Sequence, residues 1–301
     1  MAILVIGSSN TDLVVNVSSI PKPGQTVLGD SFFVNPGGKG ANQAVGAARL
    51  GKDVSFCCKT GEDDYGRAAK ELFAKEGMDT SFVFSTPDHT SGVALIAVDR
   101  NGENSIVVAS GANMDLKPED IERIGSFSRF DIVLCQLEIP LQTVEYIAVK
   151  ARTDGVKFVL NPAPACELPA SLFSRVDILT PNETEAEIIS GIKVTDTESA
   201  AAAARKIMEM GVGQVIVTLG SKGALHCSDT EQVLVPAFKV QAVDTTAAGD
   251  IFNGALCVAL SEGKEMVDAI RFASAASSIS VTRKGAQASA PYRNEVNRII
   301  I

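Results

Sequence analysis

The chain has 301 residues, of which 46% are hydrophobic and 21% are charged. This composition suits one large α/β unit with a sizeable core and excludes a disordered chain. The formal net charge is −9 and no cluster of Lys or Arg stands out. A nucleic-acid partner is therefore not expected, because neutralising phosphates needs a basic stripe. No apolar run approaches the roughly 18 residues of a membrane span, so no membrane partner is expected either.

The apolar N-terminal segment Ile3–Gly7 has no basic residues before it, so it predicts a buried strand and not a signal peptide. None of the six cysteines forms a C-x-x-C pair, and several lie in apolar runs. They are predicted to be buried thiols in a reducing compartment, and the expected location is the cytoplasm. The cysteines are Cys57, Cys58, Cys135, Cys166, Cys227 and Cys257.

Short apolar runs alternate along the chain with amphipathic or Ala-rich stretches. The expected strands are Ile3–Gly7, Val54–Lys59, Asp131–Cys135, Lys157–Leu160, Ile178–Thr180 and Gln214–Thr218. The expected helices are Ala41–Leu50, Tyr65–Glu76, Leu141–Arg152, Glu183–Ile189 and Ser199–Met210. This alternation indicates right-handed βαβ units and a mostly parallel central sheet with helices on both faces.

Two segments in the N-terminal half break this alternation. The first, about residues 12–36, holds Pro and Gly between β-rich flanks. The second, about residues 90–111, predicts a hairpin of Gly92–Val98 and Ser105–Ala109 with Asn101-Gly102 at its tip. Because no helix separates these strands, we expect a small antiparallel sheet. It would be a lid inserted in a single domain of residues 1–301.

The strongest local motif is the loop Asp244–Asp250, which runs directly into the apolar helix Ile251–Leu260. Thr245, Thr246 and Gly249 permit a tight turn, and Ala247 and Ala248 present no bulk. Successive backbone N–H groups at such a helix start form an anion site. Asp250 follows in the first helical turn, where a carboxylate can deprotonate a hydroxyl that attacks a phosphate. For this loop taken alone, a helix-capping role of Asp250 is an open alternative.

Two earlier strings offer donors and acceptors suited to sugar hydroxyls. The glycine-rich Asn35–Asn42 lets the backbone approach a ligand and presents Lys39, although it equally fits a hinge before the next helix. Gly7–Asp12 closes the first strand, where ligands bind in open α/β sheets, although an Asx turn also explains it. Neither a Walker A string nor a dinucleotide fingerprint occurs, which argues against a P-loop enzyme and a dehydrogenase.

Three later features point toward a nucleotide, each with a plainer alternative. Asn182 and Glu185 share one face of a helix start and suit phosphates with Mg²⁺, but a capping box explains them without a ligand. The turn Thr218–Gly223 suits a nucleotide contact or a simple hairpin. Glu138 ends a strand and is expected to reach the pocket. His89 and His226 are isolated, so neither a His–Cys metal cluster nor a Ser-His-Asp arrangement is expected.

Taken together, these strings resemble the ribokinase/phosphofructokinase-B family of sugar kinases, in its bacterial ribokinase branch, over essentially the whole chain. The strings are Asn10–Asp12, Gly37–Asn42, Asn161–Ala165, Pro181–Glu185, Thr218–Gly223, Asp244–Asp250 and Arg283–Gln287. The wider family usually has Gly where Ala247 stands, a mild departure because Ala still exposes its amide. The resemblance implies a three-layer α/β/α sandwich with a β-sheet lid, commonly paired as a homodimer through that lid.

The resemblance also implies ATP-dependent phosphorylation of ribose at O5 to give ribose 5-phosphate and ADP, with Asp250 as base. The transferred phosphoryl group would contact the amides of Ala247, Ala248 and Gly249. Ribose would contact Asn10, Thr11, Asp12, Gly38, Lys39, Gly40, Ala41, Asn42, Glu138 and Asp250. ATP would contact Asn182, Glu185, Thr218, Leu219, Gly220, Ser221, Lys222, Gly223, Gly249 and Ser274, with Mg²⁺ organised by Glu185. An activating K⁺ would contact Asp244, Thr246, Ser280, Arg283, Gly285 and Ser289.

Two alternatives remain at this stage. One is a kinase for a related substrate, such as deoxyribose, fructose or a nucleoside, since Phe32 and Phe33 near the lid could stack on a base. The other is a catalytically silent ribose-binding regulator, although the presence of both Gly249 and Asp250 argues against it.

Overall fold

The computed structural model describes residues 2–300, which form two sheets of unequal size. The larger sheet has nine strands in the order β13-β12-β11-β10-β9-β8-β1-β4-β5. Its neighbouring strands pair parallel except at β11–β12 and β12–β13. The strands are β1 Ala2–Ile6, β4 Asp53–Gly61, β5 Val83–Thr86, β8 Ile132–Cys135, β9 Lys157–Leu160, β10 Ile178–Leu179, β11 Gln214–Thr218, β12 Ala224–Cys227 and β13 Gln232–Val235.

All six expected strands lie in this sheet, which confirms the mostly parallel α/β prediction. Helices cover both faces, because alternate strand residues bury into two separate cores. Ile3 and Val5 pack with one helix layer, whereas Leu4 and Ile6 pack with the other. The first layer contains α1 Lys39–Arg49, α2 Asp64–Lys75, α8 Ala248–Ser261, α9 Met266–Ser280 and α10 Arg293–Ile299. The second contains α3 Pro118–Glu122, α4 Leu141–Thr153, α5 Ala170–Phe173, α6 Glu183–Ser190 and α7 Thr197–Glu209.

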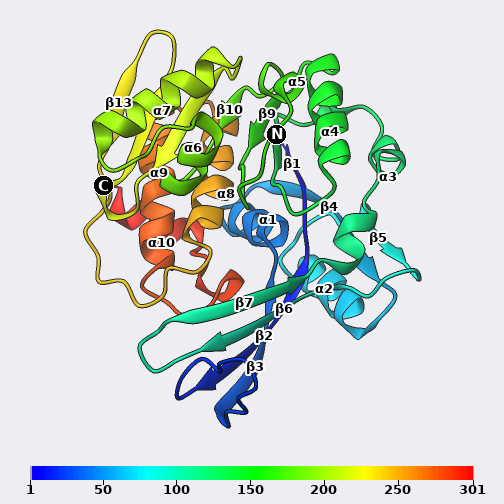
Figure 1. Cartoon of the computed structure of the whole chain (residues 1–301). Coiled ribbons are helices and arrows are strands. Elements are labelled where there is room, and N and C mark those ends of the chain that lie inside the picture. Colours follow the sequence, from blue (N-terminus) through cyan, green and yellow to red (C-terminus); the bar gives the residue numbers. More distant parts are fainter. Residues whose placement is uncertain (1, 301) are drawn as a thin grey trace.

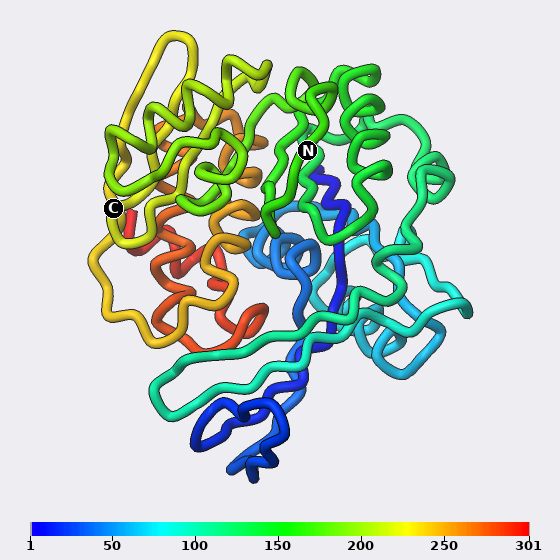
Figure 2. The backbone as a smooth tube through the Cα atoms, viewed as in Figure 1, coloured from blue at the N-terminus to red at the C-terminus, as the bar shows by residue number. Residues whose placement is uncertain are grey.

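Segments far apart in the sequence meet at the centre of the molecule. Helix α1, near the N-terminus, packs against α8, which lies more than 200 residues later (Figure 2). The contact is close because Gly254 of α8 faces the backbone of α1, where a Cβ atom would lie 2.5 Å from the carbonyl oxygen of Gln43. The start of α8 is thereby held directly beside the first turn of α1.

The small sheet projects from one edge of the α/β body (Figure 1). Its strand order is β3-β2-β6-β7, with β2 Asn10–Val17, β3 Gly29–Gly37, β6 Gly92–Val98 and β7 Asn104–Ala109. The expectation of a purely antiparallel sheet is wrong at β2–β6, which pair parallel. The reason is that β2 continues from β1 and β6 follows β5, so both chains leave the carboxyl edge of the large sheet in the same direction.

The cysteine prediction needs one correction. Five thiols are buried, but Cys166 is exposed, because it lies in the irregular segment between β9 and α5 and not in an apolar strand or helix. Within residues 2–300, no helix combines the length and the apolar character that crossing a bilayer would require.

Candidate active site

Asp250 lies in the first turn of α8, and the turn before it is strained. Ala247 is the N-cap residue and has φ 59°, the one positive φ among the non-glycine residues 2–300. A left-handed Ala is costly, and such residues cluster at functional sites. The same geometry gives a physical reason for the Gly that the wider family usually has at this position.

The turn leaves several backbone N–H groups without a hydrogen-bond acceptor in residues 2–300. The amide of Ala248 donates to the carbonyl oxygen of Thr245 at 3.2 Å. The amides of Ala247, Gly249 and Asp250 donate to no other residue within 2–300. A Cβ atom on Gly249 would meet no atom within 4 Å, so the space beside these donors is open. Free N–H groups at the start of a long helix suit a phosphoryl group.

The carboxylate of Asp250 is buried, with 7% of the residue exposed. Its Oδ2 accepts a hydrogen bond from Asn42 Nδ2 at 2.9 Å, and its Oδ1 accepts one from Gln43 Nε2 at 3.0 Å. Burial raises the pKa of Asp250, while the positive charge of Lys39 and the two amide donors oppose that rise. A carboxylate whose pKa is raised binds a proton more readily, which suits Asp250 to accept one.

The glycine-rich string serves close packing of the chain on itself. Gly38 has φ +89°, and a Cβ atom there would lie 2.7 Å from the amide nitrogen of Asn10. A Cβ atom on Gly40 would lie 2.5 Å from the amide nitrogen of Ser8. Ala41 is fully buried and its amide donates to the carbonyl oxygen of Ser8 at 2.9 Å. These contacts bring the start of α1 against the turn that follows β1.

Acidic side chains gather around Lys39 in this corner. Glu138 Oε2 accepts the amide of Lys39 at 3.0 Å and the hydroxyl of Ser8. Burial, and then the charges of Glu138 and Asp250, raise the pKa of Asp12 to about 6. Although burial opposes it, the negative charges of Asp250 and Glu138 raise the pKa of Lys39. The structure therefore gathers Asp12, Lys39, Glu138 and Asp250, as the sequence motifs predict.

Asn10 is held by a residue that the sequence motifs did not include. Its Oδ1 accepts a hydrogen bond from Asn113 Nδ2 at 2.7 Å, and Asn113 Oδ1 accepts the amide of Ser9 at 2.9 Å. Asn113 lies in the short 3₁₀ segment η1, Gly111–Asp115, and is almost fully buried. A lone Asn in a short irregular segment has no periodicity that could mark it. Thr11, next to Asn10 on β2, is half-buried.

A second missed residue is Gln43, which touches Asp250 from α1. It follows Asn42 directly in the sequence, but helical periodicity does not predict that both neighbours reach one carboxylate. Gln43 is fully buried and also bonds Asn161 and Gln136, which end β9 and β8. Since the carboxyl ends of parallel strands share one edge of the sheet, these amides converge behind Asp250.

Asn182 and Glu185 form the reciprocal capping box of α6. The Asn182 amide donates to Glu185 Oε2 at 2.8 Å, and the Glu185 amide donates to Asn182 Oδ1 at 2.8 Å. Glu185 Oε1 accepts no hydrogen bond from residues 2–300. Burial raises the pKa of Glu185, partly offset by the Asn182 amide and Lys39. The capping alternative is therefore real, and it leaves one carboxylate oxygen available.

The turn Thr218–Gly223 stands beside Asn182, since Thr218 and Asn182 form an isolated β-bridge. Within it, Gly220–Lys222 is the 3₁₀ helix η3, Ser221 is exposed and Leu219 is buried. Lys222 Nζ lies 3.6 Å from Glu183 Oε1. Ser274 is buried on α9, three residues before Ser277, whose hydroxyl donates to the carbonyl oxygen of Ala248 at 2.9 Å.

Asp244 ties together the two loops predicted to hold a cation. Its Oδ1 accepts the Thr246 amide and its Oδ2 accepts the Gly285 amide, each at 2.9 Å. Although partial burial opposes it, these bonds lower the pKa of Asp244 and keep it ionised. Ser280 and Ser289 are buried nearby in sequence, and their hydroxyls donate to main-chain carbonyls of Ser277 and Ala286, whereas Arg283 pairs with Glu295. The donor set is oxygen-rich.

Residues 2–300 contain no group of three or more His, Cys, Asp or Glu that could hold a metal ion. An ion at the Asp244 loops would therefore be held largely by carbonyl and hydroxyl oxygens, which suits a hard monovalent cation.

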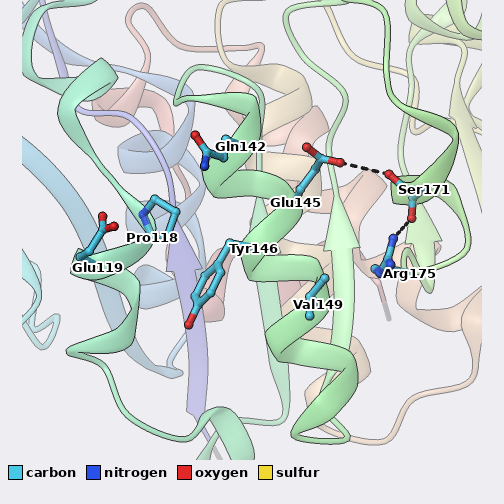
Figure 3. Close-up of a pocket in the computed structure, with 8 residues that line it drawn as sticks. All are labelled: Pro118, Glu119, Gln142, Glu145, Tyr146, Val149, Ser171 and Arg175. Atoms are coloured by element: carbon cyan, nitrogen blue, oxygen red, sulfur yellow. Dashed lines mark hydrogen bonds between the residues drawn. The ribbon is translucent and has the colours of Figure 1, made fainter.

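A surface hollow of about 410 Å³ lies elsewhere, between α3, α4 and α5 (Figure 3). Three of its polar residues are linked to one another: Ser171 donates to Glu145 at 3.1 Å, and Arg175 bonds the carbonyl oxygen of Ser171. None of the residues around Asp250 lines it. We therefore place the candidate active site at the Asp250 cluster, where the buried charges converge, and not in this hollow.

Known proteins resemble this chain over nearly its whole length. A sequence profile described as pfkB family carbohydrate kinase matches residues 2–293. The ribokinase of Haemophilus influenzae is 47% identical over 292 residues, covering 97% of this chain and 95% of that protein. The deoxyribokinase of Salmonella typhi is 39% identical and covers 100% of this chain and 99% of that protein. The structure of Arabidopsis thaliana ribokinase complexed with ribose and ATP has a TM-score of 0.92 and 34% identity, with 99% and 98% of the two chains covered.

Proposed function

The chain belongs to the pfkB family of carbohydrate kinases, and on that premise we propose that it transfers the γ-phosphoryl group of ATP to O5 of ribose. The observation that carries this proposal is the buried carboxylate of Asp250 beside the free amides of Ala247 and Gly249. A base and an anion site are thus adjacent, which is the minimum that phosphoryl transfer to a hydroxyl requires.

Ribose is proposed to bind between α1 and the start of β2. Asp12 and Glu138 would accept hydrogen bonds from its hydroxyls, and Lys39 and Asn42 would donate to its oxygens. Asn42 Oδ1 is buried and has no partner within residues 2–300, so it is an acceptor that a sugar hydroxyl can satisfy. Thr11 and the backbone of Gly38, Gly40 and Ala41 would shape this pocket.

In the proposed reaction Asp250 takes the proton from the O5 hydroxyl while that oxygen forms a bond to the γ-phosphorus. The bond from that phosphorus to the β–γ bridging oxygen breaks, and the electron pair leaves with ADP. The free amides at the start of α8 would offset the charge on the transferred group. The products are ribose 5-phosphate and ADP, and the proton stays on Asp250 until it is released to solvent.

ATP is proposed to lie across Asn182, the turn Thr218–Gly223 and the start of α8, with Ser274 toward the adenine. Mg²⁺ fits the site because Glu185 keeps one oxygen that no described residue uses. Bound there with its waters, it would supply charge neutralisation for the phosphates. A carboxylate among oxygen ligands is the donor set that Mg²⁺ prefers.

K⁺ is proposed to bind at the loops that Asp244 joins, with Thr246, Ser280, Arg283, Gly285 and Ser289 as oxygen donors. The ionised Asp244 supplies the negative charge that such a site needs. A bound cation would stabilise the Asp244–Asp250 loop, because that loop and the Gly285 segment are already linked through both oxygens of Asp244.

The small sheet is proposed to be a lid and the contact of a homodimer. The run Ile106–Val108 on β7 is exposed at every residue, and successive strand residues point to opposite faces. The sheet therefore exposes apolar side chains on both faces, including Phe32 and Leu95. One face of the sheet would close over the sugar, and the other face would pack against a second copy of the chain. The free and mostly buried thiols support a reducing compartment, the cytoplasm.

Deoxyribose is the second candidate substrate, favoured by the 39% identity to a deoxyribokinase. The deciding experiment measures ATP turnover with ribose, deoxyribose, fructose and adenosine, each with K⁺ and with Na⁺ at equal ionic strength. We expect the highest kcat/KM with ribose, a product phosphorylated at O5 by ³¹P NMR, and faster turnover with K⁺. Equal turnover of fructose would contradict ribose specificity, and higher kcat/KM for deoxyribose would favour the second candidate.

A further inference from the structure

Three buried amide side chains stand in a row behind Asp250, and each comes from a different part of the chain. Gln43 lies on α1, Gln136 follows β8 and Asn161 follows β9. Gln43 and Gln136 are fully buried, and Asn161 is 7% exposed. Buried polar groups are costly unless hydrogen bonded, so three of them behind one carboxylate call for a specific role.

The hydrogen bonds of this row run in one direction. Gln136 Nε2 donates to Gln43 Oε1 at 2.6 Å, and Gln43 Nε2 donates at 3.0 Å both to Asp250 Oδ1 and to Asn161 Oδ1. Asn161 Nδ2 in turn donates to the carbonyl oxygen of Thr180 at 3.0 Å. Both hydrogens of Gln43 Nε2 are therefore used, one of them on the proposed base.

This arrangement fixes which end of the Gln43 amide faces Asp250. A main-chain carbonyl can only accept, so Asn161 must turn its Nδ2 toward Thr180 and its Oδ1 toward Gln43. Gln43 must then present its NH₂ group to Asn161 and Asp250, and its oxygen to Gln136. Flipping the Gln43 amide would set oxygen against oxygen at two contacts and nitrogen against nitrogen at the third. The surrounding amides thus exclude the flipped state.

Charged groups from several elements also act on Asp250. Lys39 on α1 attracts a negative charge at this position, whereas Glu138, Asp12 on β2 and Glu185 on α6 repel it. Against burial and three nearby carboxylates, neutral donors that cannot titrate are a constant source of stabilisation for the ionised form. Asn42 supplies one such donor and Gln43 the other.

We propose that Gln43 is a positioning residue that, with its own amide locked by Gln136 and Asn161, holds Asp250 ionised and aimed at the attacking hydroxyl. This inference rests on the proposed role of Asp250 as the base. Gln43 itself acts through Asp250, since its side-chain donors and acceptor are all engaged by protein groups. Orientation and ionisation are separate consequences of the same bond, and each can be measured.

The test compares the pH dependence of kcat/KM for ribose in the wild type and in Gln43→Met, which keeps length and removes the donor. Loss of a hydrogen bond to a charged group should shift the acidic limb of the kcat/KM profile to higher pH by about one pH unit. We expect kcat at pH 7 to fall about tenfold or more and KM for ribose to change less than about threefold. Gln43→Glu, which puts an acceptor against Asp250, should shift the limb further in the same direction.

Gln136→Met should have an intermediate effect, because it removes the hydrogen bond to Gln43 Oε1 and leaves the bonds to Asp250 unchanged. It should move the limb upward by less than Gln43→Met does. Gln142→Met, on the exposed face of α4, is the matched control and should leave the profile unchanged. If Gln43→Met does not fold, Gln136→Met and Gln43→Glu carry the test. An unmoved acidic limb in the folded variants, with only the melting temperature lowered, overturns the inference.

The result that would contradict the proposed function differs from the result that would contradict the positioning role of Gln43. Absence of ribose phosphorylation by the wild type would contradict the function itself, whatever the variants do. Suppose instead that the wild type is active and that the Gln43 and Gln136 variants show the same acidic limb of the pH profile as the wild type. This result would contradict only the positioning role.

Discussion

Two regions of this molecule reverse the usual distribution of polar and apolar side chains. At the carboxyl edge of the large sheet, polar groups such as Asp250 and Gln43 are buried. On the small sheet, large apolar groups such as Phe32 and Val107 are exposed, at 61% and 64%. Both arrangements are costly by themselves, because buried charge loses solvation and exposed apolar surface orders water.

The two regions differ in what offsets the energetic cost of each arrangement. Most of the buried polar groups are hydrogen bonded within the chain, by bonds that link α1, α8 and the ends of the strands. Asn42 Oδ1 and Gln136 Oε1 are exceptions, because they have no partner within residues 2–300. The exposed apolar groups have no such partner among residues 2–300. The first region is therefore held together largely by the chain itself, whereas the apolar side chains of the second region find no cover within residues 2–300. The predictions below test this contrast, from the largest expected effect to the smallest.

Asp250→Asn should have the largest effect. Removing a general base costs at least about 10²-fold in kcat. The Asn side chain keeps the shape of the buried site, so ribose binding should be largely retained. Steady-state kinetics together with calorimetric titration of ribose measure both quantities. Near-normal turnover in this variant would show that Asp250 is not the base, and its bonds to Asn42 and Gln43 would then serve only the packing of α1 on α8.

The same substitution in the two sheets should give opposite results. Phe56 is fully buried in the large sheet and packs edge-to-face on Phe73, so Phe56→Ala should cost about 3–5 kcal/mol in the free energy of unfolding. Phe32→Ala should cost less than about 1 kcal/mol. Urea unfolding measures the first difference. Phe32→Ala should instead weaken self-association in sedimentation velocity, and an unchanged oligomer would remove Phe32 from the proposed dimer contact.

Two helical glycines provide a matched test of the α1–α8 contact. A Cβ atom on Gly254 would lie 2.5 Å from the main-chain oxygen of Gln43, whereas one on Gly46 would meet only the tip of Ile251 at 3.1 Å. Gly254→Ala must push α8 away from α1 and should cost about 1–3 kcal/mol, with a loss of kcat. Gly46→Ala should lie within about 1 kcal/mol of the wild type, since the gain in helix propensity offsets the small contact. Equal effects would contradict a rigid α1–α8 contact.

The smallest expected effect concerns Asp12 and pH. Its pKa is raised to about 6 by burial and by neighbouring carboxylates, above the ordinary value near 3.8. The folded state therefore binds a proton more tightly than the unfolded chain does, so the contribution of Asp12 to stability decreases as pH rises from about 4 to 6. Asp12→Asn should raise the unfolding midpoint at pH 7.5 more than at pH 4.5, and it should weaken ribose binding. A midpoint change that is equal at both pH values would contradict the raised pKa.

Local patterns in the sequence were sufficient for much of the fold and for part of the candidate site. Continuous apolar runs predicted six strands of the large sheet, and the Asn101-Gly102 turn predicted the β6–β7 hairpin. The resemblance to the sugar-kinase family implied that Asp12, Lys39, Glu138 and Asp250 share one pocket. Strands β12 and β13 were not predicted, because they return as an antiparallel hairpin without an intervening helix and so break the strand–helix alternation.

The sequence by itself determined most of the segments that become strands and helices of the large sheet and its covering layers, because backbone preference and apolar periodicity are properties of neighbouring residues. It also determined which small residues, such as Gly38 and Gly249, could permit close approach. Tertiary structure alone decided the parallel pairing of β2 with β6 and the exposure of Cys166. It likewise decided that Gln43, Gln136 and Asn161 line up behind Asp250. These outcomes depend on contacts between residues about 20 to 200 positions apart, and no local pattern records the geometry of such contacts.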